Sequence, residues 1–137
     1  MSEVMKSRTV SVSITVAPPL VYDFASNPEN LPQWAPAFCK SIEYADGAWV
    51  VRSADGPVII EFVEKNRLGV LDHTVTLESG LKIYNPMRVV PNASGSEVLF
   101  TLFQTSNMDE DKFAEDAKLV ENDLHTLKRV IEARYGE

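Results

Sequence analysis

The sequence predicts an α+β fold, in which a curved, seven-stranded antiparallel sheet wraps around a long C-terminal helix and two short helices lie between strands one and two. Two observations predict it. Glycine-containing turns recur at positions 47, 56, 69, 80 and 95, a spacing typical of short strands joined by tight turns. Near the C-terminus, the segment Asp109–Tyr135 contains no glycine or proline, and its apolar residues recur with the period of a helix.

Length and composition limit the classes of protein to consider. A chain of 137 residues predicts a single domain spanning 1–137. Acidic residues outnumber basic ones by 20 to 13, which argues against nucleic acid or an anionic membrane surface as the partner. No aliphatic run is long enough to span a membrane, and Cys39 is the only cysteine. The polar N-terminus lacks the apolar segment of a signal peptide, so we expect a cytoplasmic protein.

The first predicted strand and the two short helices occupy the N-terminal quarter of the chain. The strand, Thr9–Val16, alternates valine or isoleucine with serine or threonine over its whole length. A period of two is the pattern of a strand with one buried and one solvated face. Pro18 and Pro19 suit the first turn of one helix, and Asn27 before Pro28 suits the start of the next.

Six further strands are predicted between and beside the glycine turns. Each segment is bounded by residues that favour tight reversals of the chain. The six strands are Cys39–Ala45, Ala48–Ser53, Val58–Val63, Val70–Glu78, Leu81–Val90 and Glu97–Gln104. Consecutive strands joined by short turns form an antiparallel meander, and a meander of this length curves strongly.

The C-terminal helix is predicted over Asp109–Tyr135. Its apolar residues are spaced four and three apart, which places them on one face of a helix. They are Phe113, Ala117, Val120, Leu124, Leu127 and Ile131. Such a face must be buried, and the concave face of the curved sheet is the available partner.

These segments resemble the START-like superfamily, also called the polyketide cyclase/dehydrase and lipid-transport superfamily (SRPBCC). The stretches that carry the resemblance are Ile14–Phe24, Asn27–Trp34, Leu71–Val75 and the closing amphipathic helix. The resemblance covers nearly the whole chain and implies the helix-grip fold, with a cavity between the sheet and the long helix. Members include hydrophobic-ligand carriers, aromatic cyclases, hormone receptors and chaperone regulators, so the resemblance implies one fold and a choice of functions.

His73 is the main candidate for a functional side chain. Within the predicted strand Val70–Glu78 it shares the phase of Leu71 and Val75, so its ring is expected to point inward. Its ordinary pKa near 6.5 suits a general acid or base. The same ring could instead be a polar contact for a ligand or a core histidine bonded within the protein. Asp72 cannot be its partner, because adjacent strand residues point to opposite faces.

Other residues are candidates for the cavity wall. Tyr84 and Arg88 share one strand phase and form either a substrate clamp or a solvated strand face, and a bulge at Pro86 would move one of them. Trp34 either packs its short helix against the sheet or stacks on a ligand. The predicted ligand-binding set is Trp34, Phe38, Trp49, His73, Tyr84, Met87, Arg88, Phe100, Phe113 and Val120.

Two classes of function fit this arrangement best. The first is binding of a hydrophobic or amphipathic small molecule in the cavity. The alternative is a polyketide cyclase- or dehydratase-like enzyme with His73 as acid or base, although no second acid–base residue is evident on the inner faces. A second alternative is a regulatory protein that binds a partner through its surface, and a homodimer stays open. The histidines and the cysteine have no metal-ligand spacing, so no metal and no cofactor are expected.

Overall fold

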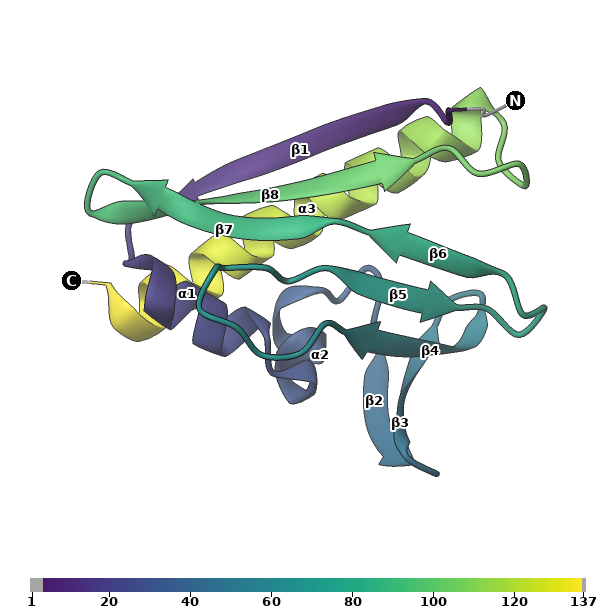
Figure 1. The fold of residues 1–137 in the computed structure, drawn as a ribbon, viewed down its shortest axis with the longest axis horizontal. Helices are drawn as coiled ribbons and strands as arrows, with labels where there is room; N and C mark the ends of the chain where they lie inside the picture. Colours follow the sequence, from purple (N-terminus) through teal and green to yellow (C-terminus); the bar gives the residue numbers. More distant parts are fainter. Residues whose placement is uncertain (1–3, 137) are drawn as a thin grey trace.

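The computed structural model describes residues 4–136, which Figure 1 traces from the N-terminal strand to the C-terminal helix. The strands are β1 (Ser7–Ile14), β2 (Ser41–Ala45), β3 (Ala48–Ser53), β4 (Gly56–Phe62), β5 (His73–Thr76), β6 (Lys82–Asn85), β7 (Met87–Asn92) and β8 (Gly95–Phe103). The helices are α1 (Pro18–Ala25), the 3-10 helix η1 (Pro28–Asn30), α2 (Leu31–Trp34) and α3 (Glu110–Tyr135). The predicted α+β class, with short helices after the first strand and a long helix at the end, is confirmed.

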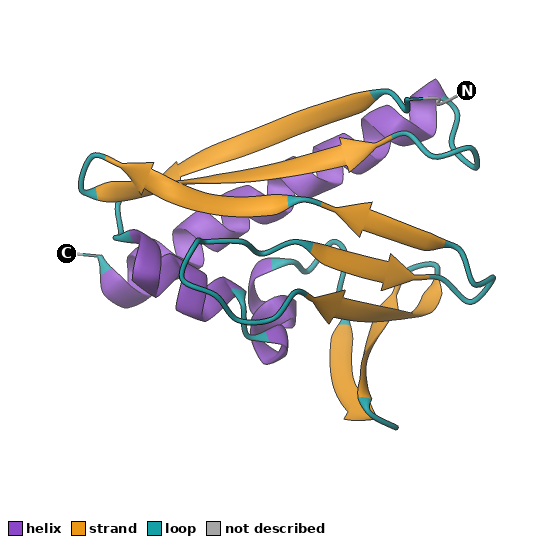
Figure 2. Ribbon diagram, in the orientation of Figure 1, coloured by secondary structure: helices purple, strands orange, loops and turns teal. Residues whose placement is uncertain are grey.

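The strands form two antiparallel sheets (Figure 2), and Pro86 separates β6 of one sheet from β7 of the other along the chain. One sheet has the order β1-β8-β7 and the other has the order β2-β3-β4-β5-β6. The sequence predicted one sheet of seven strands, with a single strand over Leu81–Val90. That prediction was wrong in this detail, because β6 and β7 are separate strands on either side of Pro86. Proline has no backbone N–H to donate to a strand ladder, so the regular pairing is interrupted there.

Residues that precede β5 join the two sheets. Leu71 N donates a hydrogen bond to Met87 O (2.8 Å), and Val89 N donates one to Gly69 O (2.9 Å). Gly69 has a φ of +74°, and a Cβ atom there would collide with the carbonyl oxygen of Val89, so only glycine fits. Through these bonds the two sheets continue into one another as a single curved surface.

Several predicted strands differ from the structure at their ends. The first runs over Ser7–Ile14 instead of Thr9–Val16, since its pairing with β8 ends opposite Ser96. The predicted strand Val70–Glu78 keeps regular pairing only over His73–Thr76. The starts of β2, β4 and β8 are each displaced by two residues. Alternating hydrophobicity marks the faces of a strand, but it does not mark where the hydrogen-bonded partner ends.

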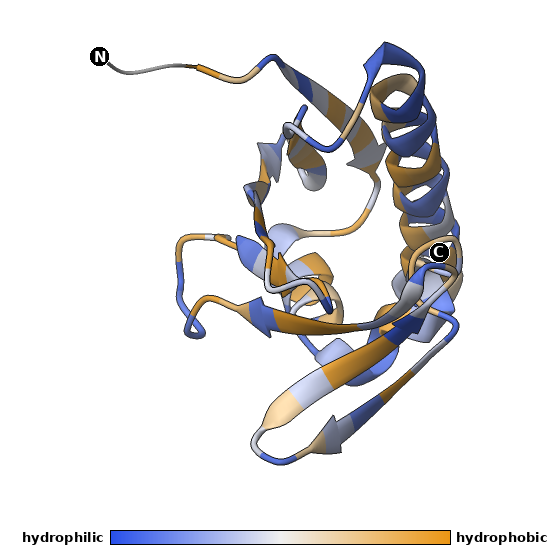
Figure 3. Ribbon diagram, turned by 90° about the vertical axis from the view of Figure 1, so that its right-hand side faces the viewer, coloured by the Kyte–Doolittle hydropathy of each residue, from blue (hydrophilic) through white to orange (hydrophobic). Residues whose placement is uncertain are grey.

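The long helix α3 packs its apolar side toward the strands. The predicted stripe is confirmed in its buried members Phe113, Ala117, Leu124, Leu127 and Ile131. In Figure 3 apolar and hydrophilic residues alternate along this helix, and Figure 1 shows it lying behind β1 and β8. It contacts β1, β8, α1 and α2. Within residues 4–136, no helix is both long and apolar enough to cross a membrane.

The short helices that follow β1 pack beside α3. The side chain of Asn27 accepts a hydrogen bond from Glu29 N (3.1 Å), as its predicted capping role requires. The next helix, α2, buries Leu31 and Trp34. This arrangement places α2 beside α3, and both helices face the curved strands across the interior.

Candidate functional site

A cavity of about 570 Å³ lies between α2, α3 and the curved strands. Most of its wall is apolar. The buried apolar side chains on the wall are Leu31, Trp34, Ala35, Val58, Ile60, Val75, Phe100, Leu102 and Leu124. A volume of this size matches sites that hold small organic molecules.

The exposed part of the wall defines the cavity mouth. Its residues are Ala54, Asp55, Pro57, Glu78, Ser79, Asn107, Lys112, Glu115 and Leu119. They come from the turn between β3 and β4 and the start of β4, from the turn between β5 and β6, from the segment before α3 and from the first half of α3. The mouth therefore opens between the ends of two strand turns and the N-terminal half of the long helix.

His73 is the buried imidazole on the wall, as its strand phase predicted. It is 6% exposed and lies between two aromatic rings, with centroid distances of 4.9 Å to Phe62 and 5.6 Å to Phe100. Its Nδ1 lies 3.0 Å from the carbonyl oxygen of Leu71, and a carbonyl can only accept, so Nδ1 is the protonated nitrogen. Burial lowers the pKa of the ring, although the hydrogen bond to Leu71 opposes this shift. Because burial is the larger effect, the imidazole is neutral. Nε2 is then a hydrogen-bond acceptor without a partner among the described residues.

Asp123 is a second ionisable group on the wall, contributed by α3. It is 7% exposed and accepts a hydrogen bond from Ala37 N (3.2 Å), which ties the segment after α2 to the long helix. Burial raises its pKa to about 6, against the lowering effect of the Ala37 and Phe38 amides. Nearby, burial and then the charge of Asp123 raise the pKa of Cys39 to about 11, so this thiol stays protonated and serves as an apolar filler.

Two further polar groups line the cavity. Trp34 Nε1 is buried and has no hydrogen-bond partner among residues 4–136. Asp116 is half-buried on α3, and its carboxylate lies 3.4 Å from Lys112 Nζ. Burial raises the pKa of Asp116, and the ion pair with Lys112 opposes that shift. Within the described part of the chain, no three histidine, cysteine, aspartate or glutamate side chains gather as they would to hold a metal ion.

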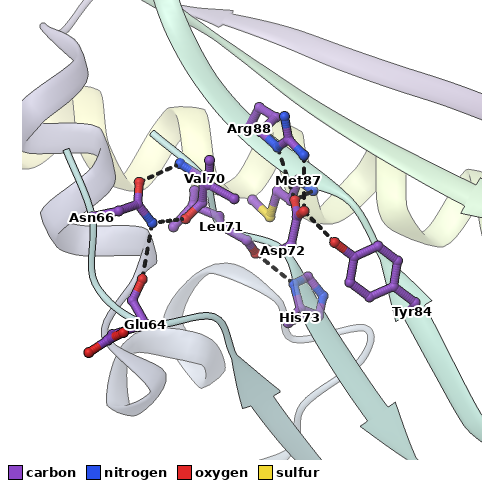
Figure 4. Close-up of polar contacts among 9 residues, drawn as sticks. All are labelled: Glu64, Asn66, Val70, Leu71, Asp72, His73, Tyr84, Met87 and Arg88. Carbon is purple, nitrogen blue, oxygen red and sulfur yellow. Dashed lines mark hydrogen bonds and ion pairs between the residues drawn. The ribbon is translucent and has the colours of Figure 1, made fainter. Parts of the chain in front are cut away.

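Just before β5, and facing away from His73, Asp72 accepts hydrogen bonds from three residues (Figure 4). Its carboxylate accepts from Met87 N (2.8 Å), from Arg88 Nε and Nη2 (3.0 Å each) and from the Tyr84 hydroxyl. Burial alone would raise the pKa of Asp72, but the bonds from Arg88, Tyr84 and Met87 outweigh it and lower the pKa to about 2. The carboxylate does not bond to His73, as the opposite strand phases predicted.

By sequence, no protein-family model matches the chain, and no curated protein matches it. Solved structures do match it. A START superfamily protein from Mycobacterium smegmatis is 13% identical, with 93% of this chain aligned to 97% of that chain and a TM-score of 0.70. The Zhui aromatase/cyclase from Streptomyces sp. R1128 is 14% identical, with coverages of 95% and 95% and a TM-score of 0.73. XoxI from Bacillus cereus is 17% identical, with coverages of 93% and 96% and a TM-score of 0.73.

The chain has the helix-grip fold. The similarity extends over nearly the full length of this chain and of each structure named above, which confirms the fold expected from the sequence resemblance. At these levels of identity the likeness concerns the fold alone. In this helix-grip chain the long helix is α3, and the cavity that it helps to close is the one lined by His73 and Asp123.

The structure brings together only part of the predicted ligand-binding set. Trp34, Phe38, His73, Phe100 and Val120 lie on the cavity wall of this helix-grip domain. The other predicted members lie elsewhere, which is a correction to the expected layout of the site. They are Trp49, Tyr84, Met87, Arg88 and Phe113.

Each displaced residue has a physical reason for its position. Tyr84 and Arg88 are about half exposed and bond to Asp72 on the outer face, so they do not form a clamp inside the cavity. Met87 and Phe113 are buried in the core away from the cavity wall. Trp49 lies on the β2–β3 hairpin, where its ring packs edge-on against Tyr44 at 5.1 Å.

Asp123 and the acidic mouth were not predicted from the sequence. No second acid–base residue was expected on the inner faces, whereas the structure places Asp123 there. A signal was available: Asp116 and Asp123 are spaced four and three residues from Val120, and Asp123 is four from Leu127, so both carboxylates lie on the helix face of the apolar stripe. No sequence pattern could have predicted the mouth, because its residues come from two strand turns and from a helix that is far from them in the sequence.

Proposed function

We propose that the protein binds a hydrophobic or amphipathic small molecule in the cavity between α3 and the curved strands. The observation that carries this proposal is the cavity itself, with a volume of about 570 Å³ and a mostly apolar wall. Ligand-binding pockets typically have volumes of roughly 300–1,000 Å³ and are lined mainly by hydrophobic and aromatic side chains.

The energetics of such a wall favour an apolar ligand. Side chains that border a space of this size contact protein atoms on one side only, so an apolar molecule gains dispersion contacts there. Its own surface leaves water at the same time, which contributes roughly 25 cal/mol per Å² of apolar area. The aromatic rings of Phe62, Phe100 and Trp34 supply broad flat surfaces for these contacts.

The imidazole of His73, a polar group inside the cavity, can orient a bound ligand. His73 Nε2 accepts, since Nδ1 donates to the Leu71 carbonyl. A hydroxyl, phenol or amine on the ligand can donate to this nitrogen and remain hydrogen-bonded when buried. An unpaired buried polar group costs about 1–3 kcal/mol, so a ligand with such a donor is favoured over a pure hydrocarbon.

A titration with the neutral fluorescent probe N-phenyl-1-naphthylamine tests the proposal. The wild type should bind saturably, with one probe per chain in native mass spectrometry. Val120→Phe places a larger side chain on the cavity wall and should weaken binding about tenfold or more, because it occupies ligand space. Val130→Phe is the matched control, since Val130 is also half-buried on α3 but lies off the cavity wall.

Substitution of His73 separates ligand contact from structural support. His73→Phe removes the acceptor and keeps an aromatic ring, so it should weaken binding of a hydrogen-bond-donating ligand while the melting temperature stays close to that of the wild type. A change confined to stability would mean that His73 is structural. Unchanged probe binding in both Val120→Phe and His73→Phe would overturn the proposal.

A second candidate function is proton-transfer catalysis in the same cavity. The observation that favours it is the presence of both His73 and Asp123 on the wall, because paired acid–base groups are what an enolising cyclase or dehydratase needs. Its test is exchange of the α-protons of a hydrophobic aryl ketone with deuterated solvent, followed by NMR. Catalysed exchange that disappears in His73→Gln, with probe binding retained, would support an enzyme. Exchange at the uncatalysed rate in the wild type would exclude this activity.

A further inference from the structure

The cavity wall carries a strong excess of negative charge. Its acidic side chains are Asp55, Glu78, Glu115, Asp116 and Asp123. Among the described residues on the wall, Lys112 is the only cationic side chain. The wall is thus more acidic than the chain as a whole, in which 13 basic residues partly balance 20 acidic ones.

The charges lie at a defined place along the cavity. Asp55, Glu78, Lys112 and Glu115 are exposed and belong to the mouth, whereas Asp123 is buried deeper, beside the segment that follows α2. Lys112 is already engaged, because its Nζ lies 3.4 Å from a carboxylate oxygen of Asp116. The three carboxylates of the mouth, Asp55, Glu78 and Glu115, form no ion pair of their own within residues 4–136.

Among the described residues, the interior offers no cationic side chain that would hold an anion, and its unpartnered donor, Trp34 Nε1, is neutral. His73 is neutral, and its one unpartnered ring atom, Nε2, accepts a hydrogen bond and does not donate one. This ring is 6% exposed and faces the cavity, so it is a built polar contact independent of the mouth. A carboxylate or phosphate placed inside would have no cationic partner, and an unpaired buried charge is strongly unfavourable. The mouth and the interior therefore disfavour an anionic ligand for two separate reasons.

We propose that the ligand is an amphiphile with a cationic nitrogen, an amine whose apolar body enters the cavity and whose ammonium group lies among the mouth carboxylates. This inference rests on the proposed binding function and specifies the chemical class of its ligand. The partly hydrated mouth can hold the ammonium group without full loss of its water. The apolar body then contacts the wall formed by Val75, Phe100 and Leu102. The same charges disfavour fatty acids and other carboxylates.

Competition with a matched set of amphiphiles tests the charge preference. Decylamine, decanol and decanoate share one chain length and differ in the charge of the head group at neutral pH. Each displaces N-phenyl-1-naphthylamine, which is uncharged and so does not bias the comparison. At low ionic strength decylamine should bind about tenfold or more tightly than decanoate, with decanol between them. The difference should shrink in about 0.5 M NaCl, because salt screens exposed charges.

Variants on α3 then locate the source of the preference. The double variant Glu115→Gln with Asp116→Asn should reduce the decylamine-to-decanoate ratio about threefold or more. The control is Glu110→Gln with Glu121→Gln, which removes two charges from the same helix off the cavity wall and should leave the ratio unchanged. Lys112→Gln removes the cationic side chain of the wall and should raise the ratio.

The outcomes distinguish the inference from the function on which it rests. If neither the probe nor any of the three amphiphiles binds, the proposed binding function fails. If the probe and decanol bind but decanoate binds as tightly as decylamine, binding stands and the cationic ligand is refuted. If the ratio is the same in the wall variant and in its control, the mouth carboxylates do not select the ligand, and the inference is overturned.

Discussion

At the scale of single residues, His73 owes its orientation to a carbonyl that the strand ladder leaves available. Leu71 N donates to Met87 O, but Met87 N donates to the Asp72 carboxylate (2.8 Å) in place of the reciprocal bond to Leu71 O. That carbonyl accepts from His73 Nδ1 instead (3.0 Å). The outer carboxylate thus determines which nitrogen of an inner ring faces the cavity, although the two side chains do not touch.

Asp123 makes the stability of the protein depend on pH in an unusual direction. Its folded pKa of about 6 lies above the ordinary value of 3.8, so the folded state holds this proton more tightly than the unfolded chain does. Its contribution to stability is therefore full below about pH 4 and is lost as the pH rises through about 6. Asp123→Asn keeps an acceptor for Ala37 N and removes the titration. Between pH 4 and pH 7.5, the free energy of unfolding of the variant should rise by up to about 3 kcal/mol relative to that of the wild type.

Chemical denaturation at several pH values measures this effect. Glu61→Gln, at an exposed position of β4, is the control and should follow the wild type. A difference between Asp123→Asn and the wild type that is the same at pH 4 and pH 7.5 would contradict the raised pKa.

At the scale of elements, Pro86 and Asp72 act together. The isolated bridge between Val70 and Arg88 and the pair His73–Asn85 have the same register, which places Asp72 opposite Pro86. Proline interrupts the ladder there, and the Asp72 carboxylate takes the place of the Leu71 carbonyl as the acceptor for Met87 N. Arg88 and Tyr84 then hold the carboxylate from β7 and β6. One side chain links the two strands across the break.

Two substitutions of Asp72 separate the roles of its shape and its charge. Asp72→Ala leaves Met87 N without its acceptor and should destabilise the protein by about 2–4 kcal/mol. Met87 N, freed from Asp72, should then donate to Leu71 O and compete with His73 Nδ1 for that carbonyl, so that the Nδ1–H tautomer of His73 is no longer enforced. Asp72→Asn keeps the acceptor oxygen and should preserve the tautomer. The ¹⁵N chemical shifts of the His73 ring report the tautomer, and an unchanged pattern in Asp72→Ala would contradict this coupling.

How far an element could be predicted from sequence depended on whether its determinants were local. The spacing along α3 contains everything that defines an amphipathic helix, and that prediction is confirmed. The inward direction of His73 followed from the period of its strand in the same way. The division at Pro86 was anticipated only as a bulge, because its partner Asp72 lies in another strand. Strand ends were misplaced for the same reason, since they depend on the length of the neighbour.

At the scale of the whole molecule, the existence of a cavity could be predicted from the sequence, but most of the residues that line it could not. The resemblance implied a space between sheet and helix, and the apolar phases supplied part of its wall, including Phe100 and Val120. The acidic mouth arises where turns near Asp55 and Glu78 meet α3, and no sequence window contains all three. The helical spacing could have placed Asp123 on the cavity side of α3. However, a carboxylate near an apolar stripe more often marks the edge of a solvated helix face.

Because of the cavity, two neighbouring leucines of α3 should contribute unequally to the stability of the protein. Leu124 borders the cavity, whereas Leu127 is equally buried but lies off its wall. Burial of Leu124 therefore yields fewer contacts, because part of its surface faces the cavity. Both replacements by alanine should destabilise the protein within the usual range of about 2–5 kcal/mol, with Leu124→Ala near the lower end and Leu127→Ala near the upper end. Urea denaturation measures both losses. Leu124→Ala should also admit a bulkier neutral probe, and an equal or larger loss there would mean that the cavity is packed shut in solution.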